Sequence, residues 1–341
     1  MKNIRESVSL KNRTTFSIGG NAKYFAQATT KSELVEICKF AKENKLQVVA
    51  LGGGSNVLIN DDGIDGVVVS LTNKDVEIKL RKSSVLVTVG AGKNWEELVG
   101  EMVKKGYQGI ECLSGIPGTT GAAPIQNIGA YGQEIKETFV SLTAYDTKLG
   151  KFKRFSKKEC QFGYRDSVFK RKGNKGRYIV YQVTLRLKKI NVPKIKYQSL
   201  TGYLEAKNIV NPTLSQVRCA VLAIRSEKLE NPKIVCNSGS FFKNPIVKKT
   251  VLKKLLTLHP DIPNFPNTAT TVKLSAGWLI DKAGWKGKKY KNVAVSTKHA
   301  LVLTNPDKLG TAKEIKELAQ KISLDVYDKF NVLLEPEVQF L

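Results

Sequence analysis

Apolar residues recur at helical spacing in five segments of the chain. Thr30 and Glu33 form a capping box, and after it four apolar residues share one helical face: Leu34, Ile37, Cys38 and Ala41. A second capping box, Thr311 with Glu314, precedes the same pattern near the C-terminus. From this spacing we expect helices at 31–45, 95–103, 213–229, 273–285 and 311–330.

Shorter apolar runs bounded by turn residues predict strands between these helices. They lie at 23–26, 47–51, 57–59, 85–89, 139–145, 151–155, 178–187, 294–303 and 333–341. Three other segments lack both patterns, and we expect a hairpin loop at 170–177, an irregular insertion at 188–200 and a turn-rich segment at 236–245. The sequence therefore predicts a mixture of helices and strands, without an internal repeat.

The segment from Ser114 to Gly132 has a composition that neither a helix nor a central strand tolerates, because almost every second residue is Gly, Ala or Pro. With few bulky side chains, its backbone N–H and C=O groups can approach a large ligand directly. Gln126, Asn127 and Tyr131 add side-chain hydrogen bonds and an aromatic face. Taken alone, the segment fits a ligand-binding loop and a long structural loop equally well.

A second glycine cluster, Gly52-Gly53-Gly54-Ser55-Asn56, joins two predicted strands. Consecutive glycines after a strand can turn their N–H groups inward as a nest for a diphosphate. The cluster is not a Rossmann turn or a Walker loop, because the third glycine, the following helix and the Walker lysine are all missing. The segment 90–93 fails the same test, since a tryptophan occupies the third-glycine position. We therefore expect a phosphate-binding turn of another kind at 52–56.

The bulk composition is that of a soluble globular protein with two or three domains: 341 residues, 41% hydrophobic and 25% charged. The N-terminus lacks the apolar core of a signal peptide, and no apolar run approaches the ~20 residues of a membrane span. We therefore expect a cytoplasmic protein without membrane insertion. Five scattered cysteines without a Cys-x-x-Cys pair argue against disulfides and structural zinc, so we expect reduced, mostly buried thiols and no bound metal.

The formal net charge of +26 raises the possibility of nucleic-acid binding, because Lys and Arg that neutralise phosphates supply most non-specific affinity. Only ten of the 56 basic residues are arginines, however, and most lysines are spread singly. Arginine is the residue that reads guanine and phosphate with two hydrogen bonds, so this composition is more typical of solvated surfaces. The excess of positive charge would still attract a polyanionic substrate.

Six motifs follow one another along nearly the whole chain: Thr15-Phe16-x-Ile18-Gly19-Gly20, Gly52 to Asn56, Gly115-Ile116-Pro117-Gly118 through Asn127-x-Gly129-Ala130-Tyr131-Gly132, Tyr164-Arg165-Asp166-Ser167, Gly239 to Pro245, and Leu334-Glu335-Pro336-Glu337-Val338. In this order they resemble the bacterial UDP-N-acetylenolpyruvoylglucosamine reductase family. The insertion that contains Tyr197 resembles the form of this enzyme that keeps a tyrosine-bearing loop over its substrate.

The resemblance implies an α+β fold with two FAD-binding domains of the vanillyl-alcohol-oxidase-like type and one substrate-binding domain. The expected boundaries are 1–72 for the first FAD-binding domain, 73–224 with 314–341 for the second, and 225–313 for the substrate-binding domain. The implied reaction is an NADPH-dependent reduction of UDP-N-acetylglucosamine enolpyruvate to UDP-N-acetylmuramate, with FAD bound non-covalently. Such an enzyme serves peptidoglycan synthesis, and thereby cell shape and division, and we expect a monomer.

The resemblance also assigns roles to single residues. Arg165 would hold the substrate carboxylate, Ser240 would donate the proton, and Glu337 would be the catalytic carboxylate. The expected FAD contacts are Gly52, Gly53, Gly54, Ser55, Asn56, Gly115, Ile116, Pro117, Gln126, Asn127, Gly129, Ala130 and Tyr131. The expected substrate contacts are Tyr164, Tyr197, Lys228, Asn244 and Lys286. From the residues alone, an arginine in a salt bridge, a turn serine and a surface glutamate explain the three catalytic candidates as well.

Two residues depart from the family pattern. Glu230 stands where proline is usual, which would loosen the turn that presents Lys228, and Gln339 stands where arginine is common. Two other functions compete with the reductase. An alcohol or lactone oxidase on the same FAD-binding fold would pass electrons to oxygen, and a nucleic-acid-binding protein would show steeply salt-dependent binding to duplex DNA.

Overall fold

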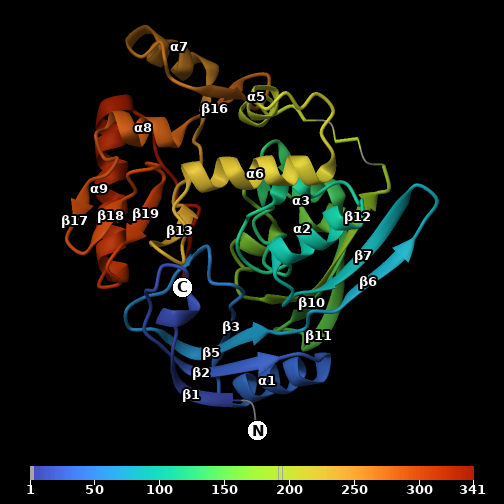
Figure 1. Cartoon of the computed structure of the whole chain (residues 1–341). Helices are drawn as coiled ribbons and strands as arrows, with labels where there is room; N and C mark the ends of the chain where they lie inside the picture. Colours follow the sequence, from blue (N-terminus) through green and yellow to red (C-terminus); the bar gives the residue numbers. More distant parts are fainter. Residues whose placement is uncertain (1–3, 191, 194) are drawn as a thin grey trace. The chain divides into compact units, whose positions relative to one another are not determined.

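The computed structural model describes residues 4–190, 192–193 and 195–341 of the chain (Figure 1). These residues form two compact units, each assembled from several chain segments. Unit 1 comprises Met1–Val8, Ala22–Gly53 and Ile64–Ser226. Unit 2 comprises Ser9–Asn21, Gly54–Gly63 and Glu227–Leu341. The division falls inside the second glycine cluster, because Gly53 ends a segment of unit 1 and Gly54 begins one of unit 2.

The first sheet of unit 1 has the strand order β1-β2-β5-β3, in which β5 pairs in parallel with both β2 and β3. These strands span Ile4–Ser9 (β1), Asn21–Ala28 (β2), Gln47–Ala50 (β3) and Ile64–Leu71 (β5). Helix α1 (Lys31–Glu43) connects β2 to β3 and begins with the predicted capping box of Thr30 and Glu33. Its four predicted inner residues are buried against β2 and β5. The sequence pattern did not predict β1 or β5.

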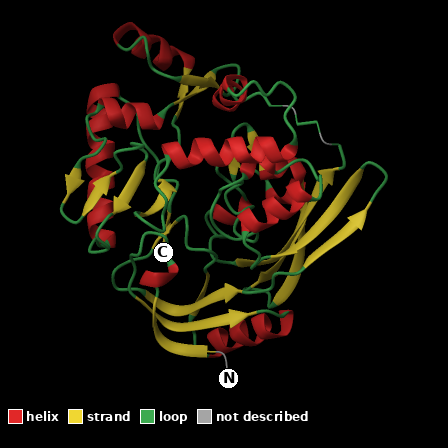
Figure 2. Cartoon of the chain, in the orientation of Figure 1, coloured by secondary structure: helices red, strands yellow, loops and turns green. Residues whose placement is uncertain are grey.

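The second sheet of unit 1 is antiparallel and has the order β11-β10-β12-β7-β6, visible as the long arrows of Figure 2. Its strands span Val76–Leu80 (β6), Ser84–Gly90 (β7), Phe139–Asp146 (β10), Lys151–Ser156 (β11) and Tyr178–Lys188 (β12). Helix α2 (Trp95–Lys104) packs its apolar face into the same core. Four of these strands and the helix confirm the predictions made from periodicity, whereas β6 was not expected.

Short elements connect these parts of unit 1. They are η2 (Glu111–Leu113), β8 (Gly129–Ala130), β9 (Gln133–Glu134), α3 (Ile135–Thr138), α4 (Lys157–Cys160) and η3 (Val168–Lys170). The glycine-rich segment 114–132 contains neither a long helix nor a long strand, as predicted. Helix α6 (Leu214–Lys228) also confirms its prediction. Helix α5 (Gln198–Ala206), in contrast, begins inside the expected insertion and was missed; it buries Leu200 and Leu204.

The main sheet of unit 2 has the order β13-β19-β18-β17, and a smaller sheet has the order β14-β16-β15. The strands are β13 (Cys236–Ser240), β14 (Ile246–Lys248), β15 (Asn264–Pro266), β16 (Thr271–Leu274), β17 (Lys289–Tyr290), β18 (Val293–Val295) and β19 (Val302–Asn305). The helices are η1 (Lys11–Arg13), α7 (Lys249–Leu258), α8 (Ala276–Lys282) and α9 (Ala312–Phe330). A further pair joins β4 (Val57–Leu58) to β20 (Gln339–Phe340) in parallel.

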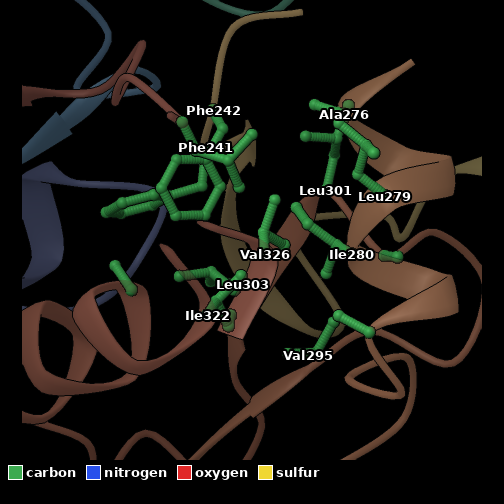
Figure 3. Close-up of a cluster of buried hydrophobic side chains, with 14 of the residues drawn as sticks. Phe241, Phe242, Ala276, Leu279, Ile280, Val295, Leu301, Leu303, Ile322 and Val326 are labelled. Carbon is green, nitrogen blue, oxygen red and sulfur yellow. The ribbon is translucent and has the colours of Figure 1, made fainter. Parts of the chain in front are cut away.

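One apolar core unites the segments of unit 2. Figure 3 shows Phe241 and Phe242 in this core, together with Leu301 and Leu303 of the β19 region and Ile322 of α9. All of α9, with its predicted capping box, packs into it. The segment 314–341 therefore lies in the same unit as 227–313, whereas the expected division placed it with 73–224. The division into three domains stays a prediction.

Four local predictions for unit 2 were wrong in part. The turn-rich segment 236–245 begins with β13, because pairing with β19 imposes extended structure on a sequence without β-branched residues. The apolar run 294–303 is interrupted by a turn, so that β18 and β19 pair with each other. The expected helix at 273–285 spans only Ala276–Lys282, because its first residues belong to β16. The expected strand at 333–341 is reduced to β20.

Four of the five cysteines are buried, Cys219 is exposed, and all are free thiols. Burial raises the pKa of the Cys38, Cys112 and Cys160 thiols to about 12, so they are unreactive at neutral pH. Within the described residues, none of the helices combines the length and the apolar character that crossing a bilayer requires.

Candidate functional site

The two glycine-rich segments meet in unit 1. A Cβ atom built on Gly53 would lie 2.9 Å from the Cα atom of Gly118, and one on Gly52 would lie 2.6 Å from Oγ1 of Thr119. Real Cβ atoms do not approach backbone this closely, so only glycine allows the contact at position 53. The sequence predicted two separate glycine-dense segments; the structure shows that they form one surface.

Main-chain amides are available on this surface. Gly52 and Gly53 are exposed and Gly118 is partly exposed. In the part of the chain that the structure describes, the amides of these three glycines donate no hydrogen bond to another protein group. Backbone N–H groups that are accessible and unpaired form the donor set that binds phosphate oxygens. The residues present therefore fit the diphosphate of a dinucleotide.

The second half of the glycine cluster belongs to unit 2. Gly54 has φ +62°, and a Cβ atom there would lie 2.0 Å from the backbone oxygen of Arg13. Asn56 donates its side-chain N–H to the backbone oxygen of Glu337 (3.3 Å) and accepts at its own backbone oxygen from Gln339 (3.0 Å). An expected FAD contact is thus hydrogen-bonded to the backbone of an expected catalytic residue.

Asn127 shapes the glycine-rich segment from within. It is fully buried and has φ +49°. Its side-chain N–H₂ donates to the backbone oxygen of Gly163 (2.9 Å) and to Glu134 (3.1 Å), and its side-chain oxygen accepts from the amide of Lys136 (3.1 Å). The side chain of Asn127 thus fixes the loop, and its expected contact with FAD stays a prediction.

Arg165 is anchored to the same loop. Its guanidinium donates to the backbone oxygen of Gly129 (2.6 Å) and lies 5.5 Å from the ring centre of Tyr164. The backbone has φ +51°, and Nζ of Lys170 donates to the Arg165 carbonyl (2.9 Å). Both the backbone and the side chain are thus held in place. A half-buried guanidinium of this kind suits a planar anion such as a carboxylate.

Two tyrosines from distant segments meet in unit 1. Tyr131 and Tyr197 stack edge to face with ring centres 5.6 Å apart. Burial raises the pKa of the Tyr131 hydroxyl, although the positive charge of Arg225 partly opposes the shift. Burial also lowers the pKa of the Arg225 guanidinium. An expected flavin contact and an expected substrate contact are therefore neighbours, whereas the importance of Arg225 was not recognised from the sequence.

Ser240 and Glu337 are brought together by backbone pairing in unit 2. The amide of Glu337 donates to the carbonyl of Phe241 (2.7 Å), and the amide of Lys243 donates to the carbonyl of Glu335 (2.9 Å). Ser240 directly precedes this pairing and is half-buried, as is Glu337. Two motifs that are almost one hundred residues apart in the sequence therefore form one short ladder.

The two carboxylates of the last motif differ in their surroundings. The side chain of Glu335 is 75% exposed and pairs with Nζ of Lys243 at 3.2 Å. Glu337 is half-buried. Lys243 is therefore already engaged by Glu335. The sequence did not distinguish the two glutamates, because alternation along a strand would point both to the same side.

Two of the remaining expected substrate contacts, Lys228 and Lys286, act on one turn of unit 2, residues 296–301. The charges of Lys228 and Lys286, which are both exposed, act on His299 in this turn. Nδ1 of His299 accepts a hydrogen bond from the amide of Leu301 (3.2 Å). Asn244 instead contacts another element, because its side-chain oxygen accepts from the amide of Ala276 at the start of α8 (3.0 Å).

Glu230 connects this turn to the segment that carries Lys228. It accepts a hydrogen bond from Oγ of Ser296 (2.9 Å) and lies 4.0 Å from Nζ of Lys298. The carboxylate of Glu230 therefore ties its segment to the turn, and the expectation that Glu230 presents Lys228 more loosely than proline would stays a prediction. Gln339, the other departure, donates its side-chain N–H to the backbone oxygen of Glu337 (3.1 Å). Both departures thus contact the expected site.

Three groups whose side chains interact at these surfaces were not indicated by the sequence: His299, Arg225, and the pair formed by Glu111 and Gln133. The only signal for His299 was the rarity of histidine, since the chain has two. Arg225 lies on a helix whose apolar pattern draws attention to other positions. Glu111 precedes the glycine-rich segment, and nothing in the sequence indicates that it is buried.

Two family models match the chain. A model of the UDP-N-acetylenolpyruvoylglucosamine reductase C-terminal domain matches residues 231–341, and an FAD-binding domain model matches residues 22–156.

Curated relatives are similar over almost their whole length. The UDP-N-acetylenolpyruvoylglucosamine reductase of Pseudomonas aeruginosa is 40% identical over 335 residues, which is 98% of each protein. That of Bdellovibrio bacteriovorus is 41% identical over 335 residues, again 98% of each. Among solved structures, the UDP-N-acetylenolpyruvylglucosamine reductase of Thermus caldophilus superposes with a TM-score of 0.69 at 25% identity and covers 99% of both chains.

The surroundings of His299 predict how stability depends on pH. Burial, followed by the positive charges of Lys228 and Lys286, lowers the pKa of His299 below its usual 6.5. The unfolded chain therefore binds a proton more readily than the folded one, and the free energy of unfolding falls as the pH drops below about 6.5. His299→Asn, which keeps an acceptor for the Leu301 amide, should reduce this slope by at most ~1.4 kcal/mol per pH unit.

Urea unfolding between pH 7.5 and pH 5 measures this effect. His259→Asn is the matched control, because it removes the other histidine of the chain. An unchanged slope in His299→Asn would contradict the prediction.

Proposed function

Because this chain belongs to the UDP-N-acetylenolpyruvoylglucosamine reductase family, we propose that it carries out the NADPH-dependent, FAD-mediated reduction of UDP-N-acetylglucosamine enolpyruvate to UDP-N-acetylmuramate in peptidoglycan precursor synthesis. It is an FAD-dependent oxidoreductase by this membership. The observation that carries the proposal is the ladder between 241–243 and 335–337, because it brings the predicted acid Ser240 and the predicted carboxylate Glu337 to one place.

We assign the FAD diphosphate to the surface formed by Gly52, Gly53 and Gly118. This assignment is supported by the three unpaired amides and by the close approach that only glycine permits. Tyr131 adds an aromatic face beside the same segment. When bound, FAD supplies a hydride acceptor for NADPH and a hydride donor for the substrate. The protein contributes the main-chain donors that hold it.

Arg165 holds the carboxylate of the enolpyruvyl group. Addition of a hydride to an enol ether develops negative charge on that carboxylate, so a fixed cation stabilises the transition state more than the ground state. The hydrogen bond to Gly129 and the contact with Tyr164 support this role, because they place the guanidinium before substrate arrives. A pre-placed charge needs no reorganisation during the reaction.

Ser240 donates the proton to the substrate carbon next to the carboxylate. Serine is a weak acid, so it needs a nearby group that stabilises its alkoxide or replaces its proton. Lys243 is paired with Glu335, which leaves Glu337 of the same ladder as the group that assists Ser240. The half-buried Glu337 and the exposed Glu335 are thus given different roles, one in proton transfer and the other in holding Lys243.

Lys228 and Lys286 bind the diphosphate of the UDP-sugar. Their joint effect on His299 supports this assignment, because it places two cations near one turn. Tyr197 contacts the sugar nucleotide from its exposed position, with Tyr131 behind it. Tyr164 and Asn244 complete the set by orienting Arg165 and the start of α8.

We further propose that the protein acts in the cytoplasm as a monomer and does not bind nucleic acid. A nucleotide-sugar and NADPH are both polyanions, and the charge of +26 would attract both ligands. Addition of UDP-N-acetylglucosamine enolpyruvate should accelerate NADPH oxidation. An unchanged rate, or consumption of oxygen in place of the sugar nucleotide, would favour an oxidase on the same fold.

Ser240→Ala should separate the two half-reactions. Reduction of the flavin by NADPH should stay near the wild-type rate, whereas reoxidation by the sugar nucleotide should slow by roughly 10²–10⁴-fold, the usual contribution of a general acid. Stopped-flow absorbance at the flavin band measures both rates. Ser238→Ala is the control, because it removes a hydroxyl from the same strand. Equal losses in both half-reactions would exclude Ser240 as the proton donor.

Glu337→Gln tests the second carboxylate. We expect flavin reoxidation to slow by about 10²-fold or more, because a neutral amide cannot assist proton transfer. Glu335→Gln serves as the control and should change this rate by less than tenfold, since Glu335 is exposed and bonded to Lys243. If stopped-flow measurements gave the same rate of flavin reoxidation for both variants, the role of Glu337 in proton transfer would be contradicted.

Gly53→Val should weaken FAD binding by at least about tenfold, because its side chain would collide with the backbone of Gly118. The apoprotein is titrated with FAD, and binding is followed by the flavin fluorescence. Gly202→Val is a suitable control, since a Cβ atom at position 202 meets nothing within 4 Å. Normal FAD affinity in Gly53→Val would show that the dinucleotide does not bind at this surface.

A further inference from the structure

A buried carboxylate lies at the start of the glycine-rich segment. Glu111 is 1% exposed, in η2 of unit 1. One of its oxygens accepts a hydrogen bond from the amide of Gly109 (2.6 Å), and the other accepts from the side-chain N–H₂ of Gln133 (2.9 Å). Both donors are neutral. Burial of a carboxylate beside neutral donors costs free energy that an apolar residue would not cost.

Gln133 completes a connection between the two ends of the segment. Its side-chain oxygen accepts a hydrogen bond from the amide of Cys112 (2.9 Å), so one amide group bonds both to the side chain of Glu111 and to the backbone of the next residue. Residues 112 and 133 flank all of the glycine-rich segment. The Glu111–Gln133 pair therefore closes this segment at its base.

The pair also sets the position of the residues that face the dinucleotide. Gln133 lies opposite Ala130 in the β8–β9 ladder, and Tyr131 and Gly132 form the turn between them. Tyr131 has φ +46° and Gly132 has φ +82°, the left-handed conformations of a two-residue hairpin turn, which a residue with a side chain such as Tyr131 adopts rarely. On the other side, Oγ of Ser114 donates to the backbone oxygen of Glu111 (2.7 Å).

We propose that Glu111 and Gln133 are positioning residues for the FAD-binding loop, and that their hydrogen bonds hold the loop in its binding conformation before the dinucleotide arrives. A loop that is rich in glycine loses much conformational entropy on ordering, and closing its ends in advance removes part of that cost from binding. The inference rests on the proposed placement of FAD beside this segment. It does not make either residue a ligand.

The donor and acceptor pattern of the pair allows a sharp test by exchange. Glu111→Gln places an N–H₂ group where an acceptor is needed, and Gln133→Glu places two carboxylates in contact. The double variant with both changes restores all three hydrogen bonds: Gln at 111 accepts from Gly109 and donates to Glu at 133, which accepts from Cys112. The double variant moves the negative charge from position 111 to position 133 and keeps the hydrogen bonds that connect the two positions.

We expect each single variant to raise the Kd for FAD by at least tenfold, and the double variant to return to within about threefold of the wild-type Kd. The measurements are FAD titration of each apoprotein by fluorescence and thermal unfolding of the same apoproteins. Asp146→Asn is the matched control: Asp146 is also 1% exposed in unit 1 and is hydrogen-bonded to Arg177, but it lies outside the glycine-rich segment. It should lower the unfolding temperature and leave the Kd unchanged.

Three results would overturn the proposal. One is a wild-type Kd in both single variants. Another is that Asp146→Asn loses as much FAD affinity as the two single variants when all three lose the same stability. The role of Glu111 and Gln133 would then be structural only. The third is a double variant that folds but binds FAD as weakly as the single variants. Normal FAD binding by Gly53→Val in the same experiment would instead show that the placement of FAD is wrong, and a wild-type protein without FAD affinity would overturn the proposed function itself.

Discussion

The backbone pairing between residues 241–243 and 335–337 is the constraint on which the organisation of unit 2 depends. On one side of it, Phe241 and Phe242 are fully buried in the core (Figure 3). On the other side, the chain continues into β20, which pairs with β4 next to the glycine cluster. The pairing thus connects the buried core with Ser240, with Glu337 and with the glycine cluster. Its hydrogen bonds fix the backbone, which is less mobile than a flexible side chain.

In unit 1, the glycine-rich segment 114–132 has few side chains of its own that could hold it in one conformation. Its glycines permit close approach, but they supply no packing energy to hold the conformation. Polar side chains do this instead: Asn127 bonds to Glu134, Lys136 and Gly163, and Arg165 bonds to Gly129. Residues with positive φ recur here, including Asn127, Tyr131 and Arg165. Such conformations persist only where the surrounding structure enforces them.

Both residues that depart from the family motifs, Glu230 and Gln339, form hydrogen bonds with neighbouring segments or residues. Glu230 connects the segment of Lys228 to the turn that contains His299, and Gln339 bonds to the backbone of Glu337.

The sequence by itself determined the helices α1, α2, α6 and α9, most strands of the antiparallel sheet of unit 1, and the identity of the motifs, because periodicity and glycine content are local properties. Only the tertiary structure decided which motifs touch. β13 is a strand because it pairs with β19. The run 294–303 forms two strands, β18 and β19, with a turn between them that contains His299. The tertiary structure also separated Glu335 from Glu337 and buried Glu111, because burial and pairing depend on residues far away in the sequence, which no local pattern encodes.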